Sequence, residues 1–234
     1  DDDRGAAAAA AGSGLTDRAA SARLGLAAGG LALWVAAVRE CFEEAGVLLA
    51  EPGGGGDGDR GGDRARGPGG VAAGHDGLVS LAEPATAARF AGHRHDLHAG
   101  RLTLAALCRA EGLRLAVGRL HYFSHWITPA GSPRRFDARF LLARAPADQP
   151  ATHDEGETTA AVWLTAAEAL ERHRAGELPM VLPTVKNLEA VAGFGDCDRL
   201  LDAARRLTSV PTVAPTIVPG PDGPRIVLPE ALRG

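Results

Sequence analysis

The apolar positions of residues 31–45 recur at steps of three and four, the spacing that places side chains on one face of an α-helix. These positions are Leu31, Trp34, Val35, Val38 and Phe42. Gly46 follows directly, and glycine adopts the left-handed conformation past a helix end without a steric cost. The pattern therefore predicts a helix over residues 31–45 that ends at Gly46.

Similar patterns predict further helices on both sides of this one. A short helix capped by Thr16 or Asp17 is expected before a Gly-Gly pair. Near the C-terminal half, Thr165 and Glu168 have the spacing of a capping box, which opens another helix. The remaining predicted helices cover residues 82–91, 102–112, 184–193 and 198–207.

Elsewhere the hydrophobic pattern changes to the shorter period of extended chain. Three runs bounded by turn residues predict strands, over residues 113–123, 134–145 and 158–164. Residues 215–229, PTIVPGPDGPRIVLP, predict two short extended segments joined by a Pro-Asp-Gly turn. The sequence of elements indicates an α/β domain with helices packed on a small mixed sheet.

The composition narrows the class of protein. Hydrophobic residues make up 45% of the 234, enough for a core, and the formal net charge of -4 offers no overall basic surface for nucleic acid. Cys41, Cys108 and Cys197 lack CxxC spacing, which argues against a disulfide framework or structural zinc. No apolar run reaches the roughly 18 to 20 residues that span a bilayer. We expect a cytoplasmic protein that binds a small molecule, without nucleic-acid or membrane partners; the oligomeric state stays open.

Segments rich in small residues suggest how the chain is divided. Residues 51–74 are rich in Gly, Asp and Arg, and we expect them to form a mobile surface loop. The expected organisation is a flexible or inserted segment over 1–30, one domain over 31–208 that carries this loop, and an extended tail over 209–234.

The predicted helix over 31–45 carries three glutamates on one face. Glu40, Glu43 and Glu44 are spaced i, i+3 and i+4, and Arg39 can reach Glu43 at i+4. Like charges at this spacing repel each other, whereas a divalent cation among them offsets the repulsion. Hard carboxylate oxygens suit Mg²⁺ or Mn²⁺, so the pattern favours a metal site over a solvated acidic face.

The segment RECFEEAGV, residues 39–47, resembles the second half of the Nudix box, R-E-U-x-E-E-x-G-U, where U is a bulky apolar residue. The complete box would begin at Gly25, which is present, and would place its first glutamate at Leu31, which is not a carboxylate. The blocks HWITPAGSPRRFDARFLLA, EGETTAAVWLTAAEAL and LPTVKNL are similar to the branch of peroxisomal coenzyme A diphosphatases and their actinobacterial relatives. That branch has an FPGG turn before the box, so we expect this turn and the first strand to precede residue 1.

The resemblance implies a Nudix fold, in which a mixed sheet is packed between helices as an α/β/α sandwich. It also implies metal-dependent hydrolysis of a nucleoside diphosphate linked to another group, with Mg²⁺ or Mn²⁺ as the cofactor. Arg39 and the three glutamates of the box would form the catalytic set, and Glu40, Glu43 and Glu44 would hold the metal. The resemblance also implies a further carboxylate from a later loop; Glu157 is the candidate named for it, and Glu155 stays open as the alternative.

Other residues are candidates for contacts with the substrate. Arg134 and Arg135 suit a diphosphate because paired guanidiniums bind phosphate oxygens, although a polar strand entry explains them equally well. Trp126 is a candidate for stacking on adenine, with a core position as the alternative. The histidines of HRHDLH, residues 93–98, suggest a zinc site only weakly, and an exposed polar turn between helices explains them better.

The substrate class follows from the resemblance. Coenzyme A or an acyl-coenzyme A is the leading expectation for the diphosphate. The alternatives are another Nudix substrate such as ADP-ribose or NADH, and a Nudix-like binding domain without catalytic activity, suggested by Leu31 in place of the first glutamate.

Overall fold

The structure is a computed structural model that describes residues 14–53, 70–152, 161–221 and 223–229. The chain divides into two compact units that alternate along the sequence. Unit 1 comprises Asp1–Leu120 and Ala143–Val162, and unit 2 comprises His121–Leu142 and Trp163–Gly234. The boundaries expected at residues 30 and 208 separate a domain from the segments before and after it. This division stays a prediction.

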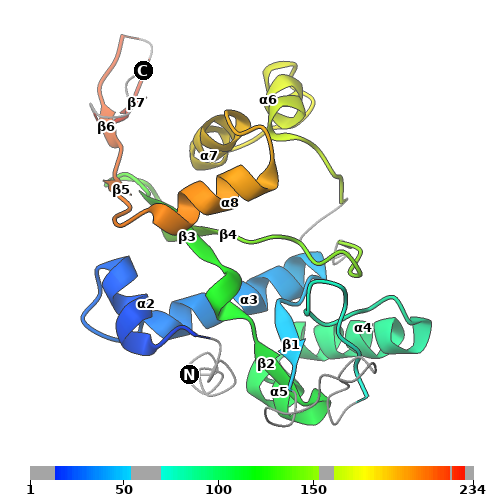
Figure 1. Cartoon of the computed structure of the whole chain (residues 1–234). Helices are drawn as coiled ribbons and strands as arrows, with labels where there is room; N and C mark the ends of the chain where they lie inside the picture. The colour runs from blue at the N-terminus through cyan, green and yellow to red at the C-terminus, as the bar shows by residue number, and fades with distance from the viewer. Residues whose placement is uncertain (1–13, 54–69, 153–160, 222, 230–234) are drawn as a thin grey trace. The chain divides into compact units, whose positions relative to one another are not determined.

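Unit 1 is built around the predicted acidic helix. This helix, α3, covers Gly30–Ala45 and packs against the short helix α2, Asp17–Leu24 (Figure 1). Gly46 has a φ of 69°, the left-handed conformation that the sequence predicts at the end of the helix. The five apolar positions read from the sequence are all buried, so α3 forms the centre of the unit 1 core.

The other strands and helices described in unit 1 follow α3 in the chain. Strand β1, Ala50–Pro52, pairs antiparallel with β2, Leu113–Leu115. Helices α4, Pro84–His98, and α5, Leu104–Glu111, lie between these two strands in sequence. The predicted helix over 82–91 extends seven residues further, so HRHDLH forms the last turns of α4 and is not a turn between helices.

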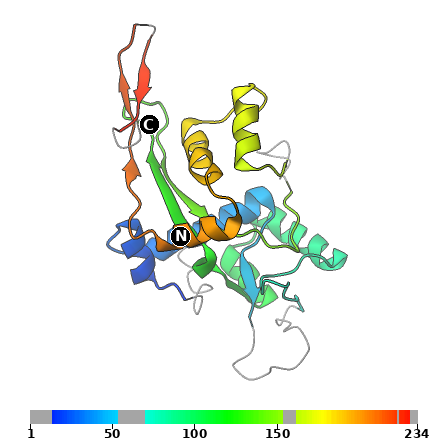
Figure 2. The same ribbon diagram turned by 45° about the horizontal axis from the view of Figure 1, so that its top comes forward.

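Unit 2 contains a three-stranded mixed sheet in the order β4-β3-β5 (Figure 2). Strands β3, His121–Ile127, and β4, Asp137–Leu142, form an antiparallel hairpin in which Trp126 pairs with Ala138. The two-residue strand β5, Thr212–Val213, adds to β3 in parallel. The combination of helices with a mixed sheet confirms the predicted α/β class.

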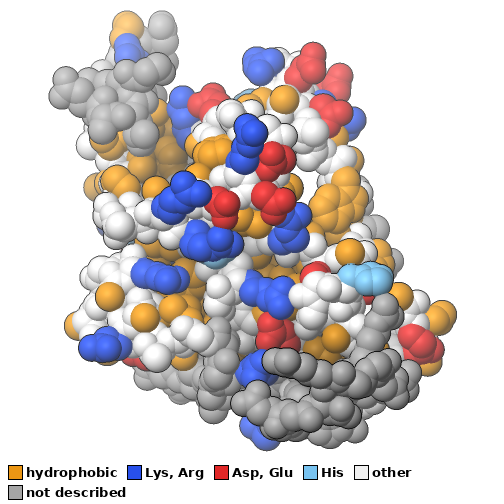
Figure 3. All heavy atoms as spheres, viewed as in Figure 1, with side chains coloured by type: hydrophobic (Ala, Val, Ile, Leu, Met, Phe, Trp, Pro, Cys, Tyr) orange, Lys and Arg blue, Asp and Glu red, His pale blue; other side chains and the backbone are white. Residues whose placement is uncertain are grey.

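Three helices and a second hairpin complete unit 2. They are α6, Ala166–Arg174, α7, Leu182–Ala192, α8, Cys197–Arg206, and strands β6, Thr216–Val218, and β7, Arg225–Val227. The capping box predicted at Thr165 and Glu168 is present at the start of α6, and β6 pairs antiparallel with β7 as predicted. Helix α8 packs on β3, and Asp202 pairs with Arg205 on this helix at 2.7 Å. Figure 3 shows acidic and basic side chains close together over the part of the surface where Figure 1 draws α8.

Two strand predictions are wrong in part. The run over 113–123 is interrupted by a 3₁₀ turn at Val117–Arg119, which separates β2 in unit 1 from β3 in unit 2. Val117 is fully buried, so the apolar pattern continues through the turn and hides it. Of the strand predicted over 158–164, the described residues 161–164 have no strand structure, and Trp163 is 69% exposed.

Within the described ranges, no helix combines the length and the apolar character needed to cross a membrane. The segment 51–74, predicted as a loop, begins with the end of β1, and its residues 54–69 lie outside the described part of the chain.

Candidate active site on helix α3

The acidic face of α3 is organised by one arginine. Arg39 donates from Nη1 to Glu43 Oε2 at 2.8 Å, and its Nη2 lies 2.6 Å from Glu40 Oε1. The predicted contact between Arg39 and Glu43 is therefore confirmed. The Glu40 side chain is 51% exposed and the Glu43 side chain only 12%, so Glu43 is the carboxylate most sheltered from water.

The surroundings of Glu43 favour an additional positive charge. Burial raises the pKa of this carboxyl, the Arg39 guanidinium opposes the rise, and the Glu40 charge adds to it. The net direction is upward, so one arginine does not fully compensate the ionised side chain. A divalent cation at this face would supply the missing charge.

Cys41 lies on the same helix between the two acidic positions. Burial raises the pKa of its thiol, and the nearby Glu44 carboxylate raises it further. The protonated thiol is a weak nucleophile, so Cys41 is better suited to an apolar position of the helix than to a reactive one.

The donor chemistry of the helix fits a hard divalent cation, because carboxylate oxygens are the ligands that Mg²⁺ and Mn²⁺ prefer. In the side-chain arrangement of the described residues, however, no three Asp, Glu, His or Cys side chains converge closely enough to hold a metal ion. Arg39 occupies oxygens of Glu40 and Glu43. Glu155 and Glu157, the candidates for a further ligand, lie outside the described residues.

The C-terminal end of α3 is held by side chains and backbone from distant parts of unit 1. Arg94, on α4, donates from Nε to the Glu43 carbonyl at 2.8 Å and from Nη2 to the Glu44 carbonyl at 2.7 Å. The Thr152 N–H donates to the Ala45 carbonyl at 2.9 Å. With the bond from Gly46 N–H to the Phe42 carbonyl, the last four carbonyls of α3 all have protein partners.

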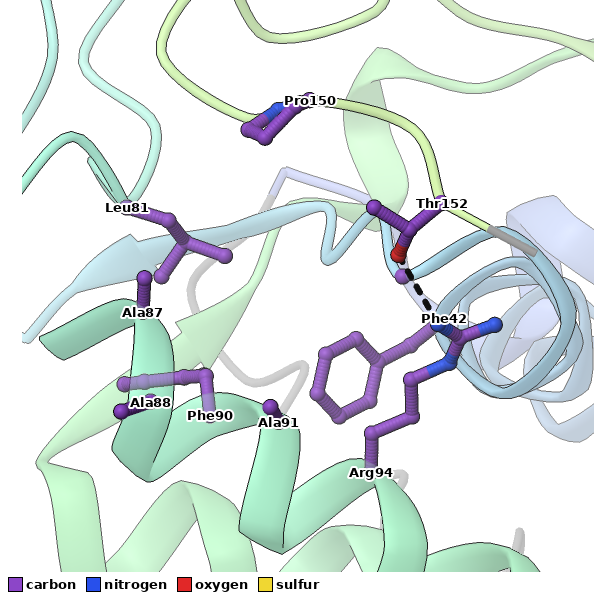
Figure 4. Close-up of a pocket in the computed structure, with 10 residues that line it drawn as sticks. Phe42, Leu81, Ala87, Ala88, Phe90, Ala91, Arg94, Pro150 and Thr152 are labelled. Atoms are coloured by element: carbon purple, nitrogen blue, oxygen red, sulfur yellow. Dashed lines mark hydrogen bonds between the residues drawn. The ribbon is translucent and has the colours of Figure 1, made fainter. Parts of the chain in front are cut away.

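Arg94 and Thr152, which we call the C-terminal cap of α3, also contact each other. Arg94 Nη1 donates to Thr152 Oγ1 at 3.0 Å, the interaction drawn as a dashed line in Figure 4. The two side chains lie at one side of a hollow of about 330 Å³, whose other lining residues, Phe42 and Phe90 among them, are mainly apolar. The cap thus joins the end of the acidic helix to the chain immediately before Glu155 and Glu157.

The segment leading to Thr152 has a second attachment to the chain that follows α3. The buried side chain of Gln149 accepts from Leu48 N–H at 2.8 Å and donates to the carbonyls of Leu48 and Val79 at 3.0 and 2.8 Å. These bonds and the C-terminal cap fix the path of residues 149–152 beside the end of α3.

The N-terminal end of α3 is capped by α2. Asp17 accepts from Leu31 N–H at 2.9 Å and from Gly29 N–H at 3.1 Å, while Ser21 Oγ accepts from Gly30 N–H at 2.9 Å. These bonds from the Leu31 and Gly29 amides lower the pKa of Asp17. A Cβ at Gly30 would lie 2.4 Å from the Ser21 backbone nitrogen, so only glycine permits this approach of the two helices.

The candidates for substrate contacts belong to unit 2. The Trp126 side chain is buried, and its Nε1–H donates to Ser124 Oγ at 2.8 Å. Arg134 and Arg135 are both exposed in the turn between β3 and β4, where Arg135 Nε donates to the Thr128 carbonyl at 3.3 Å. The structure brings these three residues to one hairpin.

A polar network in the same sheet has no signal in the sequence. His125 is buried on β3, with Nε2 2.6 Å from Asp137 Oδ1 on β4 and Nδ1 2.9 Å from Thr212 Oγ1 on β5. Arg139 donates to the same Asp137 oxygen at 2.7 Å. The network crosses all three strands of the mixed sheet, and its members are up to 87 residues apart.

The histidines of α4 do not form a zinc site in the described structure. His93 Nε2 lies 2.8 Å from Glu111 Oε1 on α5, and Arg89 binds both oxygens of the same carboxylate, from Nε at 2.9 Å and from Nη2 at 3.2 Å. Glu111 is 5% exposed, so Arg89 and His93 tie α4 to α5 through one buried carboxylate.

Comparisons with known proteins agree with the motif on α3. A family model described as the NUDT19 Nudix domain matches residues 13–191. The acyl-coenzyme A diphosphatase NUDT19 of Gallus gallus is 29% identical over 177 residues, which are 74% of this chain and 43% of that protein. The Homo sapiens protein of the same name is 31% identical over 173 residues, 73% of this chain and 41% of that protein.

A solved structure shows the same likeness in three dimensions. The crystal structure of a Nudix hydrolase from Alicyclobacillus acidocaldarius superposes with a TM-score of 0.52 and 26% identity, covering 74% of this chain and 66% of the other. The present chain spans less than half the length of the curated relatives named above.

Proposed function

Because this chain belongs to the Nudix hydrolase family and matches its NUDT19 Nudix domain over residues 13–191, we propose that it hydrolyses the diphosphate of coenzyme A or an acyl-coenzyme A. The observation that carries the proposal is the acidic face of α3, on which Arg39 holds Glu43 in a sheltered position beside two further glutamates. The relatives named as acyl-coenzyme A diphosphatases support this substrate class.

We assign the metal-binding role to Glu40, Glu43 and Glu44, with Glu157 as the further ligand. Mg²⁺ or Mn²⁺ bound there would neutralise phosphate charge and lower the pKa of a coordinated water. Arg39 would keep Glu43 oriented along the helix, as it does in the present side-chain arrangement. The sheltered position of the Glu43 side chain, which is 12% exposed and held by Arg39, supports this assignment.

Two exposed arginines of unit 2 complete the proposed set of residues. Arg134 and Arg135 would bind phosphate oxygens of the substrate, because guanidinium groups match the geometry of phosphate. Trp126 would contribute an apolar surface to the substrate, and its Nε1–H already has a partner in Ser124.

The proposal is tested by incubating the chain with coenzyme A, dodecanoyl-coenzyme A, ADP-ribose and NADH in Mg²⁺ or Mn²⁺, with EDTA as the control. We expect metal-dependent cleavage of the coenzyme A diphosphate into adenosine 3′,5′-bisphosphate and the corresponding phosphopantetheine, identified by mass spectrometry. Cleavage confined to ADP-ribose or NADH would replace the proposed substrate class. A folded chain that binds coenzyme A without cleaving any of the four compounds would instead indicate a binding domain.

A further inference from the structure

Unit 2 contains an apolar pocket that the residues discussed so far do not explain. Its volume is about 490 Å³, within the range of roughly 300 to 1,000 Å³ that is usual for small-molecule sites. It is formed by the β3–β4 hairpin, the start of α7, Pro215 just before β6, and Ile226 on β7. The lining includes Trp126, Ala138 and Phe140.

The pocket differs from the rest of the surface in its lack of charge. None of the 13 described residues that line it is charged, and its hydroxyl groups are those of Thr128 and Ser132. A phosphate or a metal ion inside it would lose hydration without gaining a charged partner, which is costly. The pocket therefore suits an uncharged, apolar group.

Several of its lining residues are large hydrophobic side chains that remain open to water. Phe136 is 65% exposed, Val181 69% and Ile226 57%. Such side chains are gathered here around one hollow, and clustered exposure of this kind marks a binding surface. Burying them against an apolar ligand would be favourable by about 25 cal/mol for each Å² removed from water.

The polar residues beside the pocket indicate the rest of the ligand. Arg134 and Arg135 immediately precede Phe136 in the β3–β4 turn, and both are exposed. The hairpin thus places two positive charges next to an uncharged apolar pocket. A molecule that carries both anionic groups and an apolar chain matches both features.

We propose that this pocket binds the acyl chain of an acyl-coenzyme A. The inference rests on the proposed function, since it names the part of that substrate which unit 2 recognises. Of the chemical groups in acyl-coenzyme A, the acyl chain is uncharged and lacks strong hydrogen-bonding groups, as the pocket lining requires. The consequence is that the chain distinguishes substrates by acyl length.

The first test compares kcat/KM for coenzyme A and for butanoyl-, octanoyl- and dodecanoyl-coenzyme A, all below their micellar concentrations. We expect kcat/KM to rise with chain length, by at least about tenfold from coenzyme A to the dodecanoyl ester, chiefly through a lower KM. A kcat/KM ratio that does not change with chain length would overturn the assignment of the pocket.

Two variants test whether the preference for long acyl chains arises in this pocket. Phe136→Ser removes an exposed ring from the rim, and Ala138→Leu adds bulk inside; each should reduce the ratio of dodecanoyl to free coenzyme A severalfold. Leu207→Ser is the matched control, because Leu207 is 47% exposed in the same unit and does not line the pocket. An equal loss in the control, or no loss in Phe136→Ser, would overturn the proposal.

Ligand binding measured in EDTA, where metal-dependent hydrolysis cannot occur, tests the pocket independently of the proposed function. Calorimetry with dodecanoyl-coenzyme A and coenzyme A should show tighter binding of the ester by wild-type protein, and Phe136→Ser should reduce the difference severalfold. If this holds while no coenzyme A compound is hydrolysed, the pocket stands and the proposed hydrolysis fails. If hydrolysis occurs while both ligands bind equally, the hydrolysis stands and the pocket assignment fails.

Discussion

The guanidinium of Arg94 donates a 2.8 Å hydrogen bond to the main-chain carbonyl of Glu43, from a helix 51 residues further along the chain. The residue proposed as a metal ligand is therefore held through its backbone by α4, independently of its side chain. This contact, together with the bonds to Glu44 and Thr152, makes Arg94 a positioning residue for the acidic helix.

Replacing Arg94 by Met should destabilise unit 1 and weaken metal binding. The change removes three hydrogen bonds from a charged donor, and we expect a loss of about 1 to 2 kcal/mol in the free energy of unfolding. Urea unfolding and Mn²⁺ titration followed by electron paramagnetic resonance would measure the two effects. Arg101→Met is the control, because Arg101 makes an exposed pair with Asp96, and its loss should change stability by less than about 0.5 kcal/mol. Equal effects of the two substitutions would remove Arg94 from its positioning role.

Glu43→Gln should abolish most activity without unfolding the chain. Gln preserves size and helix propensity and can still accept from Arg39, so helix α3 should persist. We expect kcat to fall by at least about a hundredfold and Mn²⁺ affinity to decrease. Because burial raises the pKa of Glu43, removal of its charge should leave the unfolding midpoint in EDTA unchanged or higher. Glu171→Gln, on the exposed surface of α6, serves as the control; an unaltered rate in Glu43→Gln would contradict the assignment.

The stability of unit 1 should depend on pH through Glu111. Burial alone raises the pKa of this carboxyl, but hydrogen bonds from Arg89 and His93 outweigh it and lower the pKa below the ordinary value of 4.5. The folded state therefore prefers ionised Glu111, and this contribution to stability is complete above pH 4.5. It is lost as the pH falls through the lower pKa of the folded state.

Urea unfolding followed by circular dichroism between pH 7 and pH 3 tests this dependence. Glu111→Gln should be less stable than wild type at pH 7, and the difference should narrow toward pH 3. Glu177→Gln, an exposed substitution in unit 2, should follow the wild-type curve. A gap between wild type and Glu111→Gln that stays constant over the whole range would contradict the linkage.

The three cysteines should react with thiol reagents in a fixed order. Burial raises the pKa of Cys108 to about 12 and raises the pKa of Cys41 as well, whereas Cys197 is exposed at the start of α8. Treatment with N-ethylmaleimide at pH 7.5 and peptide mass spectrometry should show Cys197 modified first, Cys41 slowly, and Cys108 only after urea is added. Early modification of Cys108 would show that α5 opens readily in the native state.

Much of the fold was readable from local signals in the sequence. The three- and four-residue spacing gave α3 with its end at Gly46, and the Thr165–Glu168 capping box gave the start of α6. These signals work because each depends on neighbours within one or two helical turns. The sequence did not reveal the turn at Val117. The residues before it are buried in unit 1 and those after it in unit 2, and both cores take apolar side chains, so the hydrophobic pattern does not change there.

The residues that hold the candidate site in place could not be predicted from local signals. The carboxylates lie together in one motif, whereas Arg94, Gln149 and Thr152 act on the end of α3 and the chain after it from 50 to 107 residues away. Nothing local distinguishes these three residues from the other polar residues of the sequence. The network of His125, Asp137 and Thr212 is likewise visible only once the strands are paired.

The interrupted course of unit 1 has a consequence for the synthesis of the chain. Residues 121–142 are synthesised before Gln149 and Thr152, so the Ala45 carbonyl at the end of α3 must wait for its Thr152 partner while the whole β3–β4 hairpin is made. At about 5 to 20 residues per second, the roughly 100 residues from Ala45 to Thr152 take about 5 to 20 s. The Ala45 carbonyl of the newborn acidic helix therefore lacks its native partner during that interval, and this is the period in which a chaperone or a protease would find unit 1 incomplete.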